Sequence, residues 1–145
     1  MPSMTTVRQL LAQKPRGVVT TSPHGSVYEA LALMAKHDIG ALPVVDNGRL
    51  VGVLSERDYA RGVALRGRTS REMIVGELMS SAVIVERSQS IEDCMALMTN
   101  QRVRHLPVVD DGRLVGIVTI GDVVKQMISA QAVLIDELEH YIRGA

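Results

Sequence analysis

The sequence is poor in aromatic residues and carries no net charge. Its 145 residues include three Tyr, no Trp and no Phe, and 16 Lys and Arg balance 16 Asp and Glu. Without excess positive charge there is no general attraction to nucleic acid or to an anionic membrane. Base-stacking surfaces for single strands usually need several aromatic residues. We therefore expect no membrane partner and treat nucleic acid as a remote alternative, kept open by a local run of arginines.

Cysteine and long apolar segments are equally scarce. Cys94 is the single cysteine, which excludes an internal disulfide, and no apolar run approaches the ~20 residues of a membrane-spanning helix. The first sixteen residues alternate polar and apolar too often for the apolar part of a signal peptide. These absences predict a cytoplasmic protein in a reducing compartment. The four His and the one Cys show no metal-ligand spacing, so no metal is predicted.

The chain does contain an internal repeat. The stretch "ALPVVDNGRLVGVLSERD", residues 41–58, returns as "HLPVVDDGRLVGIVTIGD", residues 105–122, so that each position recurs 64 residues later. Eleven of the twenty positions in 39–58 and 103–122 are identical. A repeat of this length predicts two similar structural units.

Each copy predicts a helix, then a hairpin, then a second helix. The segments 26–37 and 90–100 carry apolar residues at helical spacing. Two strands follow, joined by Asn-Gly in the first copy and by Asp-Gly in the second, which is the strongest short hairpin signal. The second helix begins near Glu56 in one copy and near Ile120 in the other. Short extended segments precede the two units: 17–22 and 82–88.

Both first helices open with a predicted capping box, in which a Ser and an acidic residue three positions later satisfy each other's backbone N–H groups. The pairs are Ser26 with Glu29 and Ser90 with Asp93. Cys94 follows at an apolar helical position, so we expect it to be a core residue and not a reactive thiol.

A single unit of about 60 residues would bury too little surface to be comfortably stable. Two units packed sheet to sheet would share one core and be related by a pseudo-two-fold axis. Such an axis creates two equivalent clefts between the units, and clefts between units are common sites for small ligands.

The repeated "LPVVD-x-G-R-LVG", the stretches "GVLSERD" and "GIVTIGD" and the helices before them resemble a tandem pair of cystathionine-β-synthase (CBS) domains, called a Bateman module. The resemblance covers about residues 7–129. It implies an α/β fold of the α+β kind, with two β-α-β-β-α units paired into a flattened disc and additional terminal helices. It also implies adenosine-containing ligands in the clefts and, for many members, face-to-face dimers. The expected boundaries are a 1–16 N-terminal helical segment, 17–67 and 81–129 as the two units, 68–80 as connector, and 130–145 as C-terminal helix.

Two Ser/Thr-x-x-Asp pairs stand where a strand ends and a helix begins. A hydroxyl at the N-cap with Asp three residues later is a capping arrangement, and the exposed N–H groups of a helix start suit phosphate. By resemblance, Asp58 and Asp122 would hold ribose, and Ser55 and Thr119 would hold ribose or phosphate. Without a ligand the same residues serve as caps only.

The twin sites differ in sequence. Arg104 and His105 replace Gly40 and Ala41, so the two clefts are not equivalent. The resemblance places a basic pair here against ligand phosphates; the alternative is a solvated Arg and a satisfied His. Gly40 and Ala41 leave room for an adenine. By resemblance, six residues would form the walls around it: Thr20, Ile39, Val83, Ile84, Val85 and Val103. The alternative for each of these six is an ordinary core residue. The prolines of the repeat complete the candidate list: Pro43 and Pro107.

The twin sites also differ in their basic residues. Arg57 has Gly121 as its twin, and with Arg61 one turn further it could reach a phosphate tail. Arg66, Arg68 and Arg71 continue the run, and all five arginines fit a solvated connector equally well. Unlike residues in twin sites imply unlike ligands. The candidates are AMP, ADP or ATP, with NAD(H) or S-adenosylmethionine as further possibilities.

Residues 122–141 predict one long helix. Its apolar positions follow 4-3-4-3-4 spacing, typical of a helix that packs on another helix: Val124, Ile128, Gln131, Ile135, Leu138 and Ile142. Two interpretations remain open. The helix folds back on its own module, against "VRQLLAQ", or it makes a dimer contact.

The function that these features favour is a stand-alone regulatory module for signal transduction. It would form a homodimer and bind an adenine nucleotide. Binding would change the relative geometry of the two units or of the dimer, and an unknown effector protein would recognise that change. We find no nucleophile-base set, no P-loop and no metal cluster, so we expect no enzyme. The alternative is a structural or protein-interaction dimer module with non-functional clefts.

Overall fold

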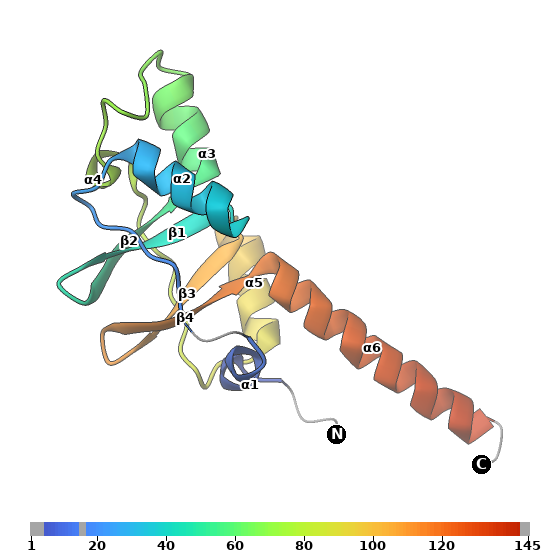
Figure 1. The fold of residues 1–145 in the computed structure, drawn as a ribbon. Coiled ribbons are helices and arrows are strands. Elements are labelled where there is room, and N and C mark those ends of the chain that lie inside the picture. The colour runs from blue at the N-terminus through green and yellow to red at the C-terminus, as the bar shows by residue number, and fades with distance from the viewer. Residues whose placement is uncertain (1–4, 15–16, 143–145) are drawn as a thin grey trace.

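The structure is a computed structural model that describes residues 5–14 and 17–142. Of the predicted terminal segments 1–16 and 130–145, residues 1–4, 15–16 and 143–145 lie outside the described residues. Helices and strands follow the repeat (Figure 1). The first half contains α2 (Val27–His37), β1 (Ala41–Asp46), β2 (Arg49–Ser55), α3 (Glu56–Tyr59) and a π-helical turn, η1 (Ala60–Ala64). The second contains α5 (Ile91–Gln101), β3 (His105–Asp110), β4 (Arg113–Thr119) and α6 (Ile120–Ile142).

The two hairpins are built alike. In both, the turn has two residues at positive φ: Asn47 (50°) and Gly48 (78°), and then Asp111 (54°) and Gly112 (80°). This is the backbone that Asn-Gly and Asp-Gly adopt in tight hairpins. Strands β2 and β4 meet at Arg49–Arg113, so the hairpins form one antiparallel sheet in the order β1-β2-β4-β3. The predicted mixed fold of two similar units is confirmed. The two hairpins join edge to edge in one sheet, however, and each unit has its own core cluster, in place of the single shared core that was expected.

Two short helices outside the repeated stretches each pack on the opposite unit. Helix α1 (Val7–Ala12) precedes the first unit but packs on the second, where Val7 and Leu10 are buried with Leu106 and Val118. Helix α4 (Val75–Leu78) precedes the second unit but packs on the first, in the core that contains Leu42 and Leu54. Each unit is therefore completed by the segment that leads into the other, and the two halves are interlocked.

Glycines of the repeat allow these crossings. A Cβ on Gly52 of β2 would lie 2.8 Å from the Ser80 carbonyl oxygen, and one on Gly116 of β4 would lie 2.6 Å from Leu11 Cδ2. Real side chains do not approach so closely, so only glycine fits without a shift of the neighbour. The repeated Gly thus marks where a foreign segment lies across each hairpin.

The helix caps agree only in part with the prediction. At α5 the box is complete: the Asp93 N–H donates to Ser90 Oγ (3.0 Å) and the Ser90 N–H donates to Asp93 Oδ2 (3.2 Å). At α2 the Glu29 N–H donates to Ser26 Oγ (3.0 Å), but the reciprocal bond predicted for Glu29 is not among the described contacts. Next to this cap the backbone pairs with residues 73–75: the Val27 N–H donates to the Met73 carbonyl oxygen (3.0 Å), and the Val75 N–H donates to the Gly25 carbonyl oxygen (2.8 Å). Cys94 is fully buried in the second unit's core, as predicted.

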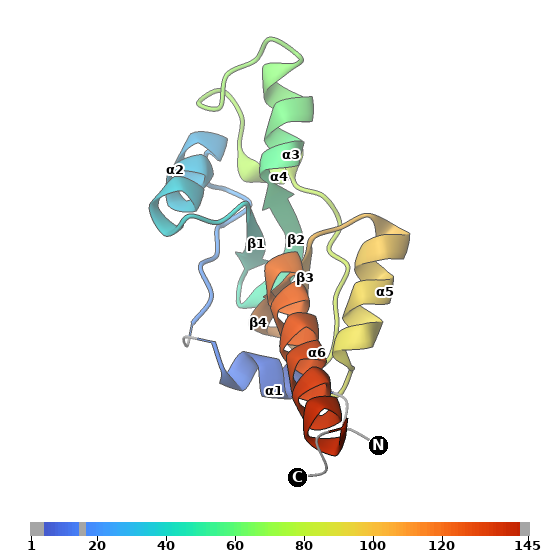
Figure 2. The same cartoon turned by 90° about the vertical axis from the view of Figure 1, so that its right-hand side faces the viewer.

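Helix α6 leaves the body of the molecule. Val123 is buried, whereas the residues from Met127 to Ile142 are exposed, and the helix projects away from both units (Figures 1 and 2). Near its base the Gln126 side chain donates a hydrogen bond to Gln13 Oε1 (2.9 Å). The interpretation in which the whole helix folds back on residues 7–13 is therefore wrong. Among the described residues, no helix has the length and apolar character needed to cross a membrane.

Candidate functional site

One large cleft lies between the two units. Its volume is about 750 Å³, within the range of small-molecule sites. It is bordered by the end of β2, by α3 and η1, by the segment after α4, and by the turn from α5 into β3. Nine of the predicted site residues line it: Gly40, Ser55, Arg57, Asp58, Arg61, Val83, Val103, Arg104 and His105.

The other predicted residues lie outside this lining. Four are buried within or beside the strands: Ala41, Pro43, Val85 and Pro107. Ile39 packs on the core of the first unit, Thr20 is partly buried, and Ile84 is half exposed. Thr119 and Asp122 stand at the twin position in the second unit. For Val85 the interpretation as plain core fits its burial, and Ala41, which was expected to leave room for an adenine, is buried as well.

Asp58 holds the start of α3 and faces the cleft. Its Oδ2 accepts hydrogen bonds from the Ser55 N–H (2.9 Å) and the Ser55 hydroxyl (3.0 Å), and its own N–H donates to Ser55 Oγ (3.1 Å). The predicted cap is thus present. Its other oxygen, Oδ1, accepts a hydrogen bond from the Ser80 hydroxyl (2.7 Å). Because carboxylate oxygens have spare lone pairs and Ser80 is exposed, Oδ1 can take hydroxyl donors from a ligand.

Cationic side chains outnumber carboxylates around this cleft. Arg57, Arg61 and Arg104 are joined by Arg102, which the sequence analysis did not select. Among the described lining residues only Glu56 and Asp58 are acidic. Arginines from both units therefore converge on one hollow, which favours an anionic ligand such as a phosphate.

His105 lies at the inner wall of the cleft. Burial lowers the pKa of its imidazole below the ordinary 6.5, and the nearby charge of Arg104 lowers it further. Glu56 partly opposes this shift, and Lys14 adds a smaller lowering. The ring is therefore neutral near pH 7. A Cβ on Gly40 would lie 3.5 Å from Glu56 Oε1 and 3.9 Å from His105 Cε1, so a side chain there would crowd the same wall.

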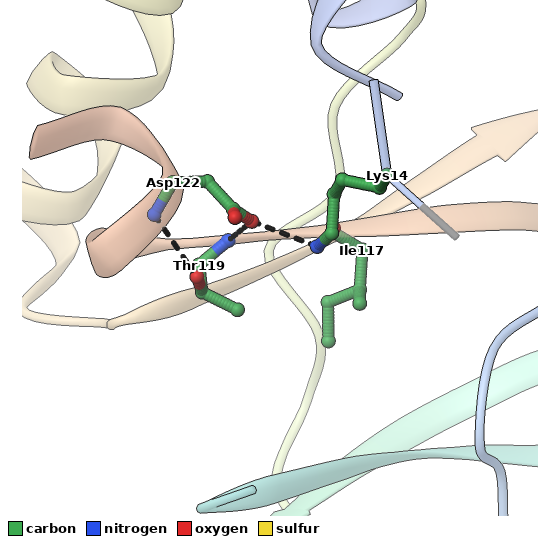
Figure 3. A network of polar contacts seen from close by, with 4 residues as sticks. All are labelled: Lys14, Ile117, Thr119 and Asp122. Atoms are coloured by element: carbon green, nitrogen blue, oxygen red, sulfur yellow. Dashed lines mark hydrogen bonds and ion pairs between the residues drawn. The ribbon is translucent and has the colours of Figure 1, made fainter. Parts of the chain in front are cut away.

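The twin position in the second unit is occupied by a lysine from the same chain. Lys14 Nζ donates to Asp122 Oδ2 (2.8 Å) and to the Ile117 carbonyl oxygen (2.8 Å), as Figure 3 shows. Asp122 also caps α6: its Oδ2 accepts from the Thr119 N–H (2.9 Å), and its N–H donates to Thr119 Oγ1 (3.2 Å). Lys14 comes from the segment after α1, which is packed on this unit.

The ion pair changes the acidity of Asp122. Burial alone would raise the pKa of its carboxyl, but the hydrogen bonds from Lys14 and Thr119 and the charge of Lys14 outweigh burial and lower the pKa below 3.8. The hollow beside Lys14 has a volume of about 310 Å³, and Thr119 and Asp122 are not among its described lining residues. At the second predicted ribose site an internal cation thus engages one oxygen of Asp122, whereas Asp58 at the first borders the large cleft.

Lys14 and Ser80 are the functional neighbours that sequence reasoning missed. Both lie outside the repeated stretches, in the segments that follow α1 and α4. Neither segment carries a motif, and only the crossing of α1 and α4 onto the opposite units brings these residues to the aspartates. The packing of α1 on the second unit is the feature from which Lys14 could have been anticipated.

Other reactive chemistry is sparse. Within 5–14 and 17–142 no three His, Cys, Asp or Glu side chains gather as they would around a metal ion. Burial raises the pKa of the Cys94 thiol to about 11, with smaller contributions from Asp93 and Glu92, so the thiol stays protonated. The exposed arginines of 66–71 lie away from the cleft lining; Arg71 stacks over the Tyr28 ring at 4.3 Å from its centroid.

The doubled unit with a crossing helix and an interunit cleft defines a class of protein. A family model for the CBS domain matches residues 7–64 and 75–129. The chain therefore belongs to the CBS-domain family, and the resemblance seen in its sequence is confirmed.

Two solved structures and one further relative are similar to this chain. A protein with CBS domains from Burkholderia ambifaria has a solved structure with a TM-score of 0.83 and 49% identity, covering 88% of this chain and 96% of that one. CBSX2, solved in complex with AMP, has a TM-score of 0.73 and 35% identity, covering 88% and 98%. The mitochondrial CBS domain-containing protein CBSX3 of Arabidopsis thaliana is 37% identical over 125 residues; these are 82% of this chain but 61% of CBSX3.

Proposed function

We propose that this CBS pair is a regulatory module that binds one adenine nucleotide in the cleft beside Asp58. The observation that carries the proposal is the convergence of Asp58 with Arg57, Arg61 and Arg104 on a single cavity of about 750 Å³. A carboxylate next to several guanidinium groups suits a ligand that has both hydroxyls and phosphate. A ribose phosphate has both.

Each part of the ligand has a partner in the cleft. The ribose hydroxyls replace the Ser80 hydroxyl at Asp58 Oδ1, and the cap bonds at Oδ2 keep the carboxylate in place. The phosphate lies against Arg104, with Arg57 and Arg61 in reach of a longer phosphate tail. The apolar side chains of Val83 and Val103 flank the base, for which Gly40 leaves room.

A relative supports this choice of ligand. CBSX2, which is 35% identical to this chain, was solved with AMP. AMP is therefore the first ligand to test, followed by ADP, ATP, NAD(H) and S-adenosylmethionine. The larger ligands differ from AMP in the groups that extend beyond the ribose. Their relative affinities therefore indicate whether Arg57 and Arg61 contact those groups.

Binding would be converted into a signal because the cleft is made by both units. Asp58 and Arg57 belong to the first unit, and Arg104 and His105 to the second. A nucleotide held by both favours one relative geometry of the units, and it shifts the population only as far as it binds that geometry better. We propose that a separate effector protein reads this geometry, that the module acts as a homodimer and not as an enzyme, and that it works in the cytoplasm.

The ligand panel tests the proposal by thermal unfolding of the full chain. A ligand at 100 times its dissociation constant adds about 2.7 kcal/mol of stability, so the binding nucleotide should raise the unfolding temperature by several degrees. No shift with any of the five ligands at millimolar concentration would overturn nucleotide sensing.

Arg104→Ala refines the test. An Arg–phosphate hydrogen bond contributes roughly 1.5–3 kcal/mol, so AMP affinity should fall about ten- to a hundredfold, while adenosine affinity stays nearly unchanged. Arg68→Ala is the matched control, because Arg68 is exposed and lies outside the cleft lining. An equal loss for adenosine and AMP would place the phosphate elsewhere.

The second candidate is a structural dimer module whose clefts bind nothing. It is favoured by one observation: both aspartates are already engaged, Asp58 by Ser55 and Ser80, and Asp122 by Lys14 and Thr119. The double variant Asp58→Ala with Asp122→Ala separates the two ideas. If partner binding and its response to nucleotides survive the double variant, the clefts have no regulatory role.

A further inference from the structure

The projecting part of α6 exposes an apolar face. The exposed fractions of the residue surfaces are 61% for Ile128, 56% for Ile135, 51% for Leu138 and 80% for Ile142. Met127, Leu134 and Tyr141 widen the same face on one side, at seven-residue intervals. A contiguous apolar surface of this kind on a helix held away from the body marks an interaction site.

The spacing of this face is self-complementary. Its positions follow 4-3-4-3-4, a series that is the same in both directions: Val124, Ile128, Gln131, Ile135, Leu138 and Ile142. A helix with such a seam matches a second copy of itself running the opposite way. Every seam residue then meets a seam residue of the other helix, as in the core of a two-stranded coiled coil.

We propose that this face of α6 pairs with α6 of a second copy in antiparallel orientation, with the two-fold axis crossing the seam midway between Gln131 and Ile135. In this register Ile128 faces Leu138 of the partner subunit, and Val124 faces Ile142 of the partner subunit. Gln131 faces Ile135 of the partner subunit near the middle. The proposal does not depend on nucleotide binding.

Charge selects the antiparallel orientation. Lys125 and Glu139 flank the seam on the same side, each seven residues from Ala132. Antiparallel pairing brings Lys125 next to Glu139 of the partner subunit, and this happens twice in the dimer. Parallel pairing would instead leave Lys125 and Glu139 at opposite ends of the helix pair, so neither would meet an opposite charge on the partner subunit.

The arrangement also suits the shape of the protomer. The helix extends from the body at its N-terminal end only (Figures 1 and 2). Antiparallel pairing therefore places the two bodies at opposite ends of the helix pair, whereas parallel pairing would put them side by side at the same end. Because α6 begins at Ile120 and Asp122 caps it, the paired helices continue directly from the Lys14-bound aspartate.

The first test uses two apolar positions on opposite sides of the same helix. Ile135→Asp places a charge in the seam and should weaken dimerisation at least a hundredfold in sedimentation of the full chain. Val133→Asp is the control: Val133 is exposed to a similar degree, 58%, but lies on the far face, so the dimer should persist. Circular dichroism checks that both variants keep their helix content.

The second test addresses orientation. Lys125→Glu should weaken the dimer severalfold, since it faces Glu139 of the partner subunit, and Lys125→Glu with Glu139→Lys should restore it. A wild-type chain that stays monomeric at 100 micromolar, or an Ile135→Asp variant that dimerises as well as wild type, overturns the pairing. Failure of the double reversal to restore the dimer overturns the antiparallel register.

Discussion

The two aspartate sites of this CBS pair are built from the same repeated motif and differ in the side chains that contact the aspartates. At the first, Asp58 is held by its own cap and by the hydroxyl of Ser80, next to an open volume of about 750 Å³. At the second, Asp122 is held by the same kind of cap and by the ammonium of Lys14. A neutral hydroxyl is easily displaced by a ligand hydroxyl, and a partly buried ion pair is not. The repeat thus sets the cap geometry of both aspartates, while segments outside the repeat supply their different neighbours.

The largest expected difference between the clefts is in affinity. Asp58→Ala should weaken AMP binding about a hundredfold, because it removes a charged acceptor from the ribose and also the cap of α3. Asp122→Ala should leave AMP affinity within about twofold. Isothermal titration of both variants measures this contrast. Equal losses for the two variants would show that the clefts are not distinct.

Alanine substitutions at Gly52 and Gly116 compare how tightly a segment from outside the repeat packs on each hairpin. Gly52→Ala should destabilise the fold by about 2–3 kcal/mol, since its new Cβ meets the Ser80 backbone, which cannot move alone. Gly116→Ala should cost about 1 kcal/mol, since it meets the end of the flexible Leu11 side chain. Urea unfolding of each variant gives the free energies. The reverse ranking would contradict the described packing of 79–80 on β2.

Removing the internal cation should make the second cleft more like the first. Lys14→Met should lower the free energy of unfolding at pH 7 by about 1–2 kcal/mol, because the ion pair is partly exposed. The pKa of Asp122 is lowered in the fold, so this stabilisation is complete above pH 3.8 and is lost as the pH falls through the lower folded value. Wild type and Lys14→Met should therefore converge in stability in strong acid.

The same variant has a binding readout. With Asp122 free, a titration of Lys14→Met with AMP should show a second, weaker site in addition to the first. Gln13→Met, one residue earlier on the same segment, serves as the control and should show one site. A single unchanged site in Lys14→Met would mean that something other than Lys14 closes the second cleft.

The smallest expected difference is in pH dependence, because only the first cleft has a histidine at this place; its twin is Ala41. A bound phosphate favours the charged imidazole, so nucleotide binding by wild type should strengthen about two- to threefold between pH 7.5 and 6 relative to His105→Asn. Comparison with the variant cancels the titration of the phosphate itself. His24→Asn, an exposed position near Asp46, should behave as wild type.

Much of this organisation was predictable from local sequence. The Asn47-Gly48 and Asp111-Gly112 turns specify both hairpins because their backbone needs positive φ, and the Ser/Thr-x-x-Asp pairs specify where α3 and α6 begin. The seam spacing likewise predicted the long α6. These signals are local, acting within a few residues.

What could not be predicted depends on contacts between distant segments. Lys14 reaches Asp122 only because α1 packs on the second unit, and Ser80 reaches Asp58 only because α4 packs on the first. Within the repeat, Gly52 and Gly116 mark where a segment crosses each hairpin, but a glycine does not say which segment crosses it.

A crystal structure of the chain grown with saturating AMP tests the central claim most directly. The account predicts a nucleotide in the first cleft, with its ribose on Asp58 and its phosphate at Arg104, and Lys14 still bonded to Asp122. A nucleotide on Asp122 with Lys14 displaced, or no nucleotide beside Asp58, would contradict it.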